Sequence, residues 1–389
     1  TPYNGPMALP PEVCIRGAGI VGRTLALLLA GARVRVALVV PPVDAAARAR
    51  EDIRAYALNT ASRALLESLR AWPDPQHATT VREMMIHGDD GGSVHFSAPH
   101  QKVDALAWIV DVPALEQRLA DAVRFSPMID VVDEPVAAPL TVVCEGKASA
   151  TRQALGVRYD LTRYPQHAIA ARFVAQRPHD EIARQWFNDA GEVLALLPLG
   201  GPGGQSLALV WSVDQAHAPA LQALGADEFA AAVREACGDA LGELKPVGER
   251  AAWPLQRAIA DRWTGQTADG ASWALAGDAA HTVHPLAGQG LNLGLADAQA
   301  LARVLGEREH WRSVGDPRLL RRYERSRRAE VLAMSLATDG LQQLFAHSLD
   351  PLPRLRNWGM RGFDRIGFVK RWVARQAMGL QHAATPGAH

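Results

Sequence analysis

Residues 12–40, EVCIRGAGIVGRTLALLLAGARVRVALVV, contain the pattern that decides the fold. A short run rich in β-branched residues leads into a GxGxxG motif at Gly17, Gly19 and Gly22, and an apolar helix and an alternating strand follow. In such a unit the first glycine permits a tight turn, the second lets a pyrophosphate approach the backbone, and the third lets the helix pack closely on the sheet. The order strand, glycine turn, helix and strand therefore predicts a dinucleotide site in an α/β fold.

The second strand of this unit ends without the acidic residue that usually accepts hydrogen bonds from the adenosine ribose. It ends at Val39 and Val40, and two prolines follow. Asp44 lies a few residues further on, and it either reaches back to the ribose or is an ordinary loop residue. Without a carboxylate acceptor at the strand end, we expect the dinucleotide to be held weakly.

A second glycine-rich stretch, GDAAHTVHPLAGQGLNLGLADA at residues 277–298, runs from a predicted strand into a helical pattern of Leu and Ala. Unpaired backbone N–H groups gather at a helix N-terminus, so a glycine turn at this point suits a negative or electron-rich group. His281 and His284 flank the turn, and their spacing alone favours hydrogen-bonded structural histidines over acid–base residues.

The amino-acid composition argues against a nucleic-acid-binding protein, a disulfide-stabilised protein and a membrane-spanning protein. The 389 residues carry 41 Lys and Arg against 41 Asp and Glu, so no net field attracts nucleic acid. Cys14, Cys144 and Cys237 lie far apart without a CxxC pair, which favours buried thiols over disulfides or metal ligands. No apolar run reaches the roughly 18 residues of a membrane span, and the first residues do not resemble a secretion signal.

The middle of the chain predicts a second architecture. Residues 51–72 indicate a loop followed by an amphipathic helix, and residues 111–123 a helix with Pro113 in its first turn. Several strands between residues 171 and 214 include a hairpin that turns at GGPGG, residues 200–204, which indicates an antiparallel sheet. Its apolar residues are candidates either for the wall that covers the substrate or for the hydrophobic core. They are Trp186, Phe187, Leu196, Leu197, Pro198 and Trp211.

Six segments in order resemble a known family: GAGIVG, Arg54, CEGKAS, EVLALLPL, the stretch 277–298 and LLRRYERSRR. Together they are similar to class A FAD-dependent monooxygenases, specifically the ubiquinone-biosynthesis (polyprenyl-methoxyphenol) hydroxylase family. The resemblance implies a Rossmann-like FAD-binding domain interlocked with an antiparallel β-sheet substrate domain, as in para-hydroxybenzoate hydroxylase, and a C-terminal helical region. We expect the FAD-binding domain to comprise residues 11–72, 101–160 and 256–310, the substrate domain residues 73–100 and 161–255, and the helices residues 311–389.

The resemblance also implies the site. Asp278 would accept hydrogen bonds from the flavin ribitol, and the loop before the helix would present N–H groups to the isoalloxazine edge that is negative in the reduced flavin. Residues placed at the reacting ring are Pro285, Gly288, Gln289 and Gly290. The other residues expected to hold FAD are Gly17, Gly19, Gly22, Arg54, Glu145, Gly146, Asp278, Leu291 and Asn292. Glu145 stands where the family has Asp, so its side chain is one methylene longer. No metal site is expected.

The implied activity is hydroxylation of a polyprenylated phenol in ubiquinone biosynthesis, with O2 as co-substrate and a flavin C4a-hydroperoxide as the oxygen donor. NAD(P)H or another electron donor would reduce the flavin. Two alternatives remain: a hydroxylase of a small soluble phenol, and a flavin-poor structural member of a quinone-biosynthesis complex.

The C-terminal segment, residues 353–376, combines seven Arg and Lys with one Asp and four aromatic residues. This pattern is typical either of a helix at an anionic membrane or an acidic partner, or of a solvated helix with its aromatics in the core. We therefore expect a cytoplasmic protein, with a peripheral site on the inner membrane face as the further possibility.

Overall fold

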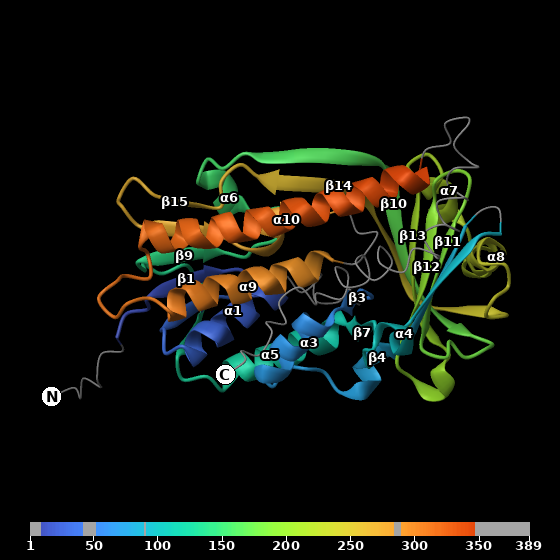
Figure 1. Ribbon diagram of the computed structural model, residues 1–389, viewed down its shortest axis with the longest axis horizontal. Coiled ribbons are helices and arrows are strands. Elements are labelled where there is room, and N and C mark those ends of the chain that lie inside the picture. Colours follow the sequence, from blue (N-terminus) through green and yellow to red (C-terminus); the bar gives the residue numbers. More distant parts are fainter. Residues whose placement is uncertain (1–8, 42–51, 89–90, 284–288, 347–389) are drawn as a thin grey trace.

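The computed structural model describes residues 9–41, 52–88, 91–283 and 289–346, with side chains up to residue 334. A parallel sheet with long helices lies at one end of the molecule and a large sheet, antiparallel except between β11 (Ile182–Phe187) and β5 (Glu83–His87), at the other, and two long strands run between them (Figure 1). The mixed α/β architecture expected from the sequence is confirmed.

The first sheet is parallel except at one edge. In spatial order its strands are β15 (Thr264–Gln266), β16 (Ser272–Leu275), β9 (Leu140–Val143), β1 (Val13–Arg16), β2 (Val36–Val39) and β8 (Ile129–Val132). Helices α1 (Ile20–Gly31) and α9 (Gly290–Gly306) share a buried core with these strands. The βαβ unit predicted from residues 12–40 is thus present. The free thiols of Cys14, Cys144 and Cys237 are buried, as expected.

A small three-stranded sheet lies beside this layer, in the order β3 (Ala55–Leu58), β7 (Ala107–Asp111) and β4 (Ala78–Val81). Helices α3 (Thr60–Ser68) and α5 (Val112–Arg124) pack on it. The prediction of a loop before this helix was wrong at residues 55–58, because these residues form a strand that pairs antiparallel with β7. That pairing depends on a partner some fifty residues away, so local periodicity does not reveal it.

The large sheet has eight strands. In spatial order they are β17 (His281–Thr282), β14 (Leu244–Ala260), β10 (Tyr159–Ala175), β13 (Ser206–Asp214), β12 (Val193–Pro198), β11 (Ile182–Phe187), β5 (Glu83–His87) and β6 (Ser93–Ser97). The GGPGG hairpin joins β12 to β13 through η2 (Pro202–Gly204), as predicted. The strands β10 and β14 span the boundaries expected at residues 160 and 255, and the domain division itself stays a prediction.

The two faces of the large sheet have different neighbours. Leu196 and Trp211 belong to the core under α7 (Ala218–Ala223) and α8 (Ala226–Ala236), with Phe229. Leu197 belongs instead to a core shared with the small sheet. Because side chains alternate between the faces of a strand, Leu196 and Trp211 serve as core under the helices, whereas Leu197 lies on the face toward the parallel layer.

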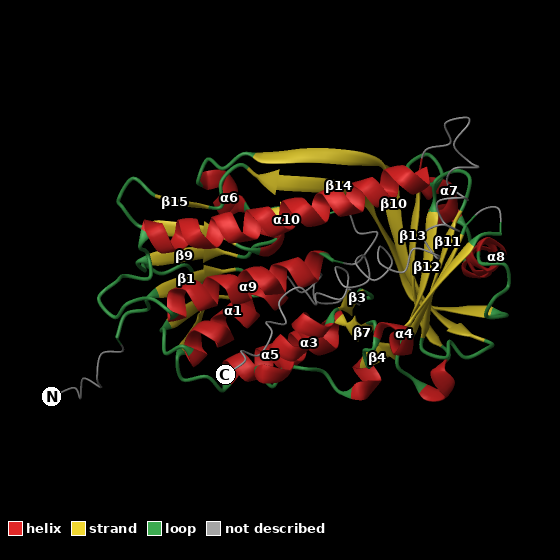
Figure 2. Ribbon diagram, in the orientation of Figure 1, coloured by secondary structure: helices red, strands yellow, loops and turns green. Residues whose placement is uncertain are grey.

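The long helix α10 (Pro317–Ala346) runs across the parallel layer toward the large sheet (Figure 1). Short elements complete the fold: η1 (Pro75–His77), α4 (Ala98–Gln101), α6 (Ala150–Ala154) and η3 (Gly277–Ala279). Figure 2 shows how helices flank the parallel layer while strands dominate the other end. None of the helices within the described ranges is long and apolar enough to cross a bilayer.

Candidate cofactor site

The glycine motifs meet at one edge of the parallel sheet. Strands β1, β9 and β16 run parallel, and they end within two residues of Gly17, Glu145 and Gly277 respectively. The carboxyl edge of a parallel sheet is where α/β proteins hold their ligands. The fold therefore gathers three segments that the sequence singled out separately.

The first glycine turn leaves no room for side chains except at its middle position. Gly17 has φ +109°, and a Cβ there would overlap the carbonyl of Cys144. A Cβ at Gly22 would overlap the carbonyl oxygen of Gly17, so α1 packs directly on the turn. A Cβ at Gly19 would meet no described atom within 4 Å beyond its chain neighbours. Gly19 is also the N-cap of α1, whose first turn carries no capping side chain and no acidic residue.

The start of α9 offers a second open helix N-terminus. The helix begins at Gly290, where a Cβ would again meet no described atom within 4 Å, and its N-cap Gln289 makes no side-chain capping bond. A Cβ on Gly294 would lie 2.8 Å from a methyl carbon of Val21, so the first turns of α9 and α1 pack closely. Pro285, Gly288, His284 and Asp44 lie outside the described residues.

Asp278 presents an available carboxylate beside these helix starts. No described residue donates a hydrogen bond to its side-chain oxygens, whereas its backbone oxygen accepts one from the Tyr159 hydroxyl at 2.7 Å. Burial raises the pKa of Asp278, and the positive charges of Lys147, His281 and Arg54 act in the opposite direction. A partly buried acceptor to which no described residue donates suits the hydroxyl groups of a ligand.

Arg54 lies close enough to Asp278 to influence its pKa, but its guanidinium already has a partner. It donates from Nε and from a terminal nitrogen to Asp52, at 2.8 and 2.6 Å. Its side chain is 48% exposed. The structure thus brings Arg54 to the site predicted for it, paired with an acid that a phosphate would have to replace or join.

The Glu145 carboxylate is already hydrogen-bonded to residues of its own loop. Its carboxylate accepts hydrogen bonds from the hydroxyls of Ser149 and Thr151 at 2.7 and 2.5 Å, and it pairs with Arg16 at 3.1 Å. The longer side chain thereby organises the start of α6. Gly146 has φ +77° and open space around it, so its backbone is the part of this motif best placed to meet a ligand.

Asn292 has a structural task. Its amide oxygen accepts from the backbone N–H of Asn59 at 3.0 Å and from the Ser62 hydroxyl at 2.7 Å, and its amide nitrogen donates to the Ala57 carbonyl at 2.9 Å. These bonds connect α9 to β3 and α3. Leu291 packs partly against the same core. For Asn292, therefore, only the backbone is left to contact a cofactor, whereas the Leu291 side chain is partly exposed.

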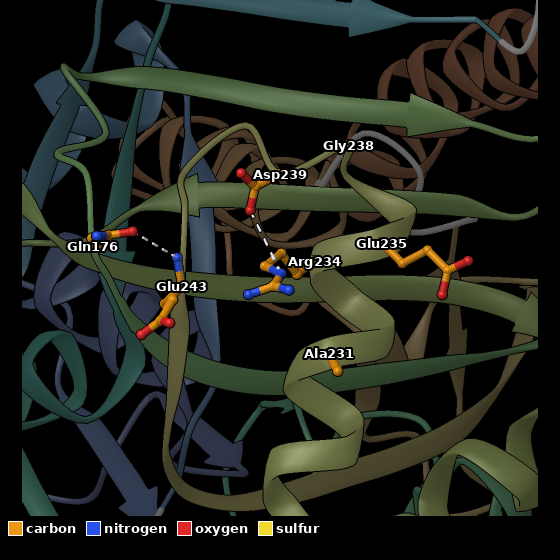
Figure 3. Close-up of a pocket in the computed structure, with 7 residues that line it drawn as sticks. All are labelled: Gln176, Ala231, Arg234, Glu235, Gly238, Asp239 and Glu243. Carbon is orange, nitrogen blue, oxygen red and sulfur yellow. Dashed lines mark hydrogen bonds and ion pairs between the residues drawn. The ribbon is translucent and has the colours of Figure 1, made fainter.

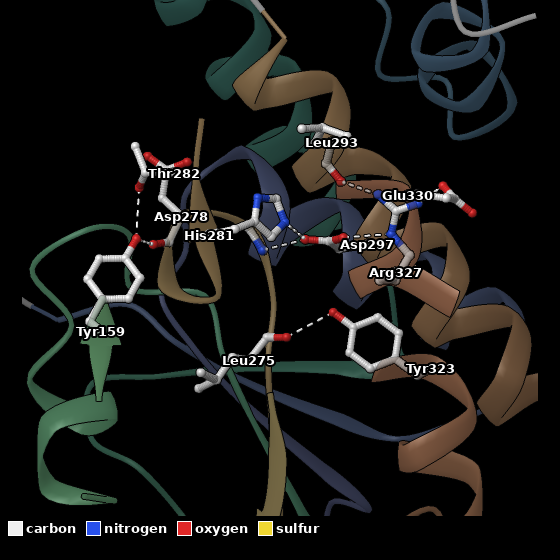
Figure 4. Close-up of polar contacts among 11 residues, drawn as sticks. Tyr159, Leu275, Asp278, His281, Thr282, Leu293, Asp297, Tyr323, Arg327 and Glu330 are labelled. Carbon is white, nitrogen blue, oxygen red and sulfur yellow. Dashed lines mark hydrogen bonds and ion pairs between the residues drawn. The ribbon is translucent and has the colours of Figure 1, made fainter. Parts of the chain in front are cut away.

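A buried ionic cluster lies behind the Asp278 turn (Figure 4). The fully buried carboxylate of Asp297 accepts from the backbone N–H of Gly277 at 2.9 Å, from His281 Nε2 at 2.7 Å and from Arg327 Nε at 2.7 Å. Burial would raise the pKa of Asp297, but the charges of His281 and Arg327 outweigh it and hold the pKa below its ordinary value. The structural role predicted for His281 is confirmed.

The residues that fix this turn from behind were not predicted from the sequence. Arg327 reaches it from α10, and Arg152 donates to the Ala279 carbonyl at 3.2 Å while its guanidinium lies 3.7 Å from the Tyr159 ring centre. Asp297 and Arg327 both fall within segments that carried the family resemblance. Their contact could not be found, because it depends on how α10 crosses α9.

The turn and the two helix starts fit FAD. The N-termini of α1 and α9 have no capping side chains, so their N–H groups are available to the pyrophosphate and to the electron-rich edge of the flavin ring. A glycine at each helix start leaves space for these groups. Asp278 offers the acceptor that ribitol hydroxyls need. Across the described parts of the chain, no three His, Cys, Asp or Glu side chains form a cluster that could hold a metal ion.

An open hollow of about 630 Å³ lies elsewhere, at the C-terminal end of α8 (Figure 3). Its lining is Gln176, Ala231, Arg234, Glu235, Gly238, Asp239 and Glu243. Arg234 and Asp239 pair with each other there, and α8 covers the face of the large sheet opposite to Leu197. The hollow is therefore separate from the glycine turns.

Comparison with known proteins supports the same cofactor. The sequence profile described as "FAD binding domain" matches residues 126–337. The chain is 33% identical to "Ubiquinone hydroxylase UbiL" of Rhodospirillum rubrum, over 97% of this chain and 92% of that protein. It is 30% identical to "3-demethoxyubiquinol 3-hydroxylase" of Escherichia coli, over 95% of this chain and 99% of that one.

The fold has solved counterparts. The p-nitrophenol 4-monooxygenase of Pseudomonas putida superimposes with a TM-score of 0.72 and 17% identity, over 95% of this chain and 98% of that chain. A likeness at this identity concerns the fold alone. Taken with the full-length sequence matches, it confirms the expected architecture, and the chain belongs to the family of FAD-dependent monooxygenases that includes the ubiquinone-biosynthesis hydroxylases.

Proposed function

We propose that this enzyme hydroxylates a polyprenylated phenol in ubiquinone biosynthesis. The observation that carries the proposal is the match, over nearly the whole length of both chains, to proteins named as ubiquinone and demethoxyubiquinol hydroxylases. The Asp278 turn and the open start of α9 support it, because they offer FAD the contacts described above.

The residues of the site divide the work of holding the cofactor. Gly17, Gly19 and Gly22 would let the N-terminus of α1 hold the pyrophosphate, and Asp278 would accept hydrogen bonds from the ribitol hydroxyls. The backbone around Gln289 and Gly290 would face the isoalloxazine, and Pro285 and Gly288, which the family resemblance assigns to the same site, lie outside the described residues. Bound FAD supplies the redox chemistry that activates O2, with NAD(P)H or another donor providing electrons.

The face of the large sheet toward the cofactor would position the substrate. Leu197 lies there among apolar neighbours, and the register of β11 and β12 places Phe187 on the same side. Apolar walls exclude water and suit an aromatic ring with a hydrocarbon tail. The protein then needs no side-chain nucleophile: it orients the ring and keeps water out.

Deleting the gene from its host and extracting the quinones tests the function. We expect a demethoxy or otherwise unhydroxylated prenylated precursor to accumulate, and the plasmid-borne wild-type gene to remove it. Normal quinone content in the deletion strain, in a host without a second hydroxylase of this family, would contradict the proposal. Accumulation that is equally cured by a variant unable to bind FAD would favour a structural role in a biosynthetic complex.

Replacing Val40 by glutamate should tighten FAD binding. Val40 follows β2, and its backbone N–H donates to the Val132 carbonyl at 2.8 Å, so the strand end is fixed near the predicted ribose. A hydrogen bond to a charged acceptor contributes roughly 1.5–3 kcal/mol, which is on the order of tenfold to a hundredfold in affinity. Titration of apoprotein with FAD measures the change. Equal, tight binding by both proteins would show that the missing carboxylate does not matter.

We also propose that the basic, aromatic C-terminal segment attaches the enzyme to an anionic membrane surface. The support is its sequence alone, since residues 347–389 lie outside the described part of the chain. Vesicle flotation should show binding that rises with anionic lipid content and falls with salt, since charge at a surface is screened. Binding that ignores both would count against it. Contact with other proteins of quinone biosynthesis stays a proposal.

A further inference from the structure

Arg327 lies far from the glycine motifs in sequence, yet it reaches the turn that carries Asp278. Its side chain is 2% exposed, and it donates to Asp297 at 2.7 Å and to the Leu293 carbonyl at 3.3 Å. It also pairs with Glu330 one turn further along α10. The guanidinium therefore joins α10, α9 and the ionic cluster (Figure 4).

We propose that Arg327 is a positioning residue for FAD, which acts on Asp278 through Asp297. The proposal rests on the cofactor site proposed above. One oxygen of Asp297 accepts from Arg327, and the other accepts from the backbone N–H of Gly277 and from the His281 ring. Those two donors lie on either side of Asp278 in the chain. Arg327 thus fixes the carboxylate of Asp297, which in turn fixes the Asp278 turn.

Removing the guanidinium would change the state of Asp297. A fully buried carboxylate that loses its permanent cation must either take up a proton or move toward other donors. Either change weakens the bonds to Gly277 and His281. Gly277 has φ +64°, so the direction of the chain into Asp278 depends on this one residue staying in place. The carboxylate of Asp278 would then leave the position that suits the ribitol.

Tyr323 provides a matched control on the same helix. It is as buried as Arg327, and its hydroxyl donates to the Leu275 carbonyl at 2.8 Å, at the end of β16. It makes no hydrogen bond to Asp297, Gly277 or His281 among the contacts of the described residues. Tyr323→Phe therefore removes one hydrogen bond between α10 and β16 and leaves the ionic cluster intact.

A double-mutant cycle on FAD affinity tests the proposal. Apoproteins are titrated with FAD at a temperature where circular dichroism shows each variant folded. We expect Arg327→Met to weaken FAD binding about tenfold or more, because small displacements of positioning groups have effects of this size. Tyr323→Phe should change it by less than about twofold. In an Asp278→Asn background, Arg327→Met should lose most of its effect, since coupled residues are not additive.

The outcomes separate the possibilities. The same loss of affinity with and without Asp278→Asn would show that Arg327 only stabilises the fold, and so would an equal loss from Tyr323→Phe. If Arg327→Met does not fold, Arg327→Lys takes its place in the cycle, because it keeps the charge but not the several contacts of the guanidinium. If wild-type apoprotein binds FAD and Asp278→Asn binds it equally well, the proposed site fails, which is a result distinct from failure of the Arg327 coupling.

Discussion

Replacing Gly19 by valine is expected to leave the apoprotein folded while weakening FAD binding about a hundredfold or more. The backbone at Gly19 is extended, with φ −75° and ψ −173°, so any residue can adopt it. A Cβ there meets no described atom within 4 Å. The loss of an N-cap glycine costs up to about 1 kcal/mol. The added methyl groups would instead occupy the space that the pyrophosphate needs beside the N–H groups of α1.

Gly31 supplies the control for this variant. It lies at the other end of α1, where an added Cβ also meets no described atom within 4 Å. Gly31→Ala should leave FAD affinity unchanged and raise stability slightly, because alanine is the better helix former. Fluorescence titration with FAD and thermal unfolding of the apoproteins measure both effects. Wild-type FAD affinity in folded Gly19→Val would overturn the assignment of this turn to the pyrophosphate.

Replacing Asp297 by asparagine is expected to lower the free energy of unfolding by about 3–5 kcal/mol, the usual result of removing one partner of a buried ion pair. Arg327 would keep its buried charge with only the partly exposed Glu330 as a carboxylate partner, and three donors would compete for one amide oxygen. This is a large part of the roughly 5–15 kcal/mol that stabilises a domain. Urea unfolding of apoproteins measures it, with the exposed Asp130→Asn as control. A loss below about 1 kcal/mol would contradict the proposed role.

The loss should also depend on pH in a defined direction. The pKa of Asp297 is held below its ordinary value in the folded protein, whereas in the unfolded chain it is about 3.9. Its ionised form therefore contributes stability above that pH, and the contribution disappears as pH falls through the lower, folded pKa. The difference in stability between wild type and Asp297→Asn should shrink in acid. A difference that grows toward low pH would show that the carboxylate is not stabilised as described.

Local patterns predicted the parts of the fold that local chemistry determines. The turn at Gly17 needs a positive φ and the first helical turn needs Gly22, so the motif is visible in the sequence. The GGPGG hairpin is visible for the same reason. Strand β3 was missed, because its partner is remote. Leu196 and Leu197 were predicted together, as candidates for the wall that covers the substrate or for core, and the structure separates them, because adjacent side chains lie on opposite faces of a strand and only one face is covered by α8.

The same distinction applies to the site. The glycines of the GxGxxG motif could be named from their spacing, and Asp278 from the family resemblance of residues 277–298. The partner of Asp297 could not, since 30 residues separate it from Arg327 and an amphipathic helix carries several arginines. The engagement of Glu145 with Ser149 and Thr151 was equally hidden, although all three are neighbours in sequence. The partner to which a side chain hydrogen-bonds depends on how deeply both groups are buried and how they are oriented, and neither follows from the spacing of residues in the sequence.

The Asp278 turn connects the two sheets of the molecule. On one side it continues β16 of the parallel sheet, and on the other it leads into β17, which pairs with β14 of the large sheet. A twist of one sheet against the other would therefore bend the turn that is proposed to hold the ribitol. The turn is therefore a mechanical joint between the two sheets, and its angle would affect the affinity for FAD. Substitutions far out on β14 could then alter flavin binding without touching the flavin.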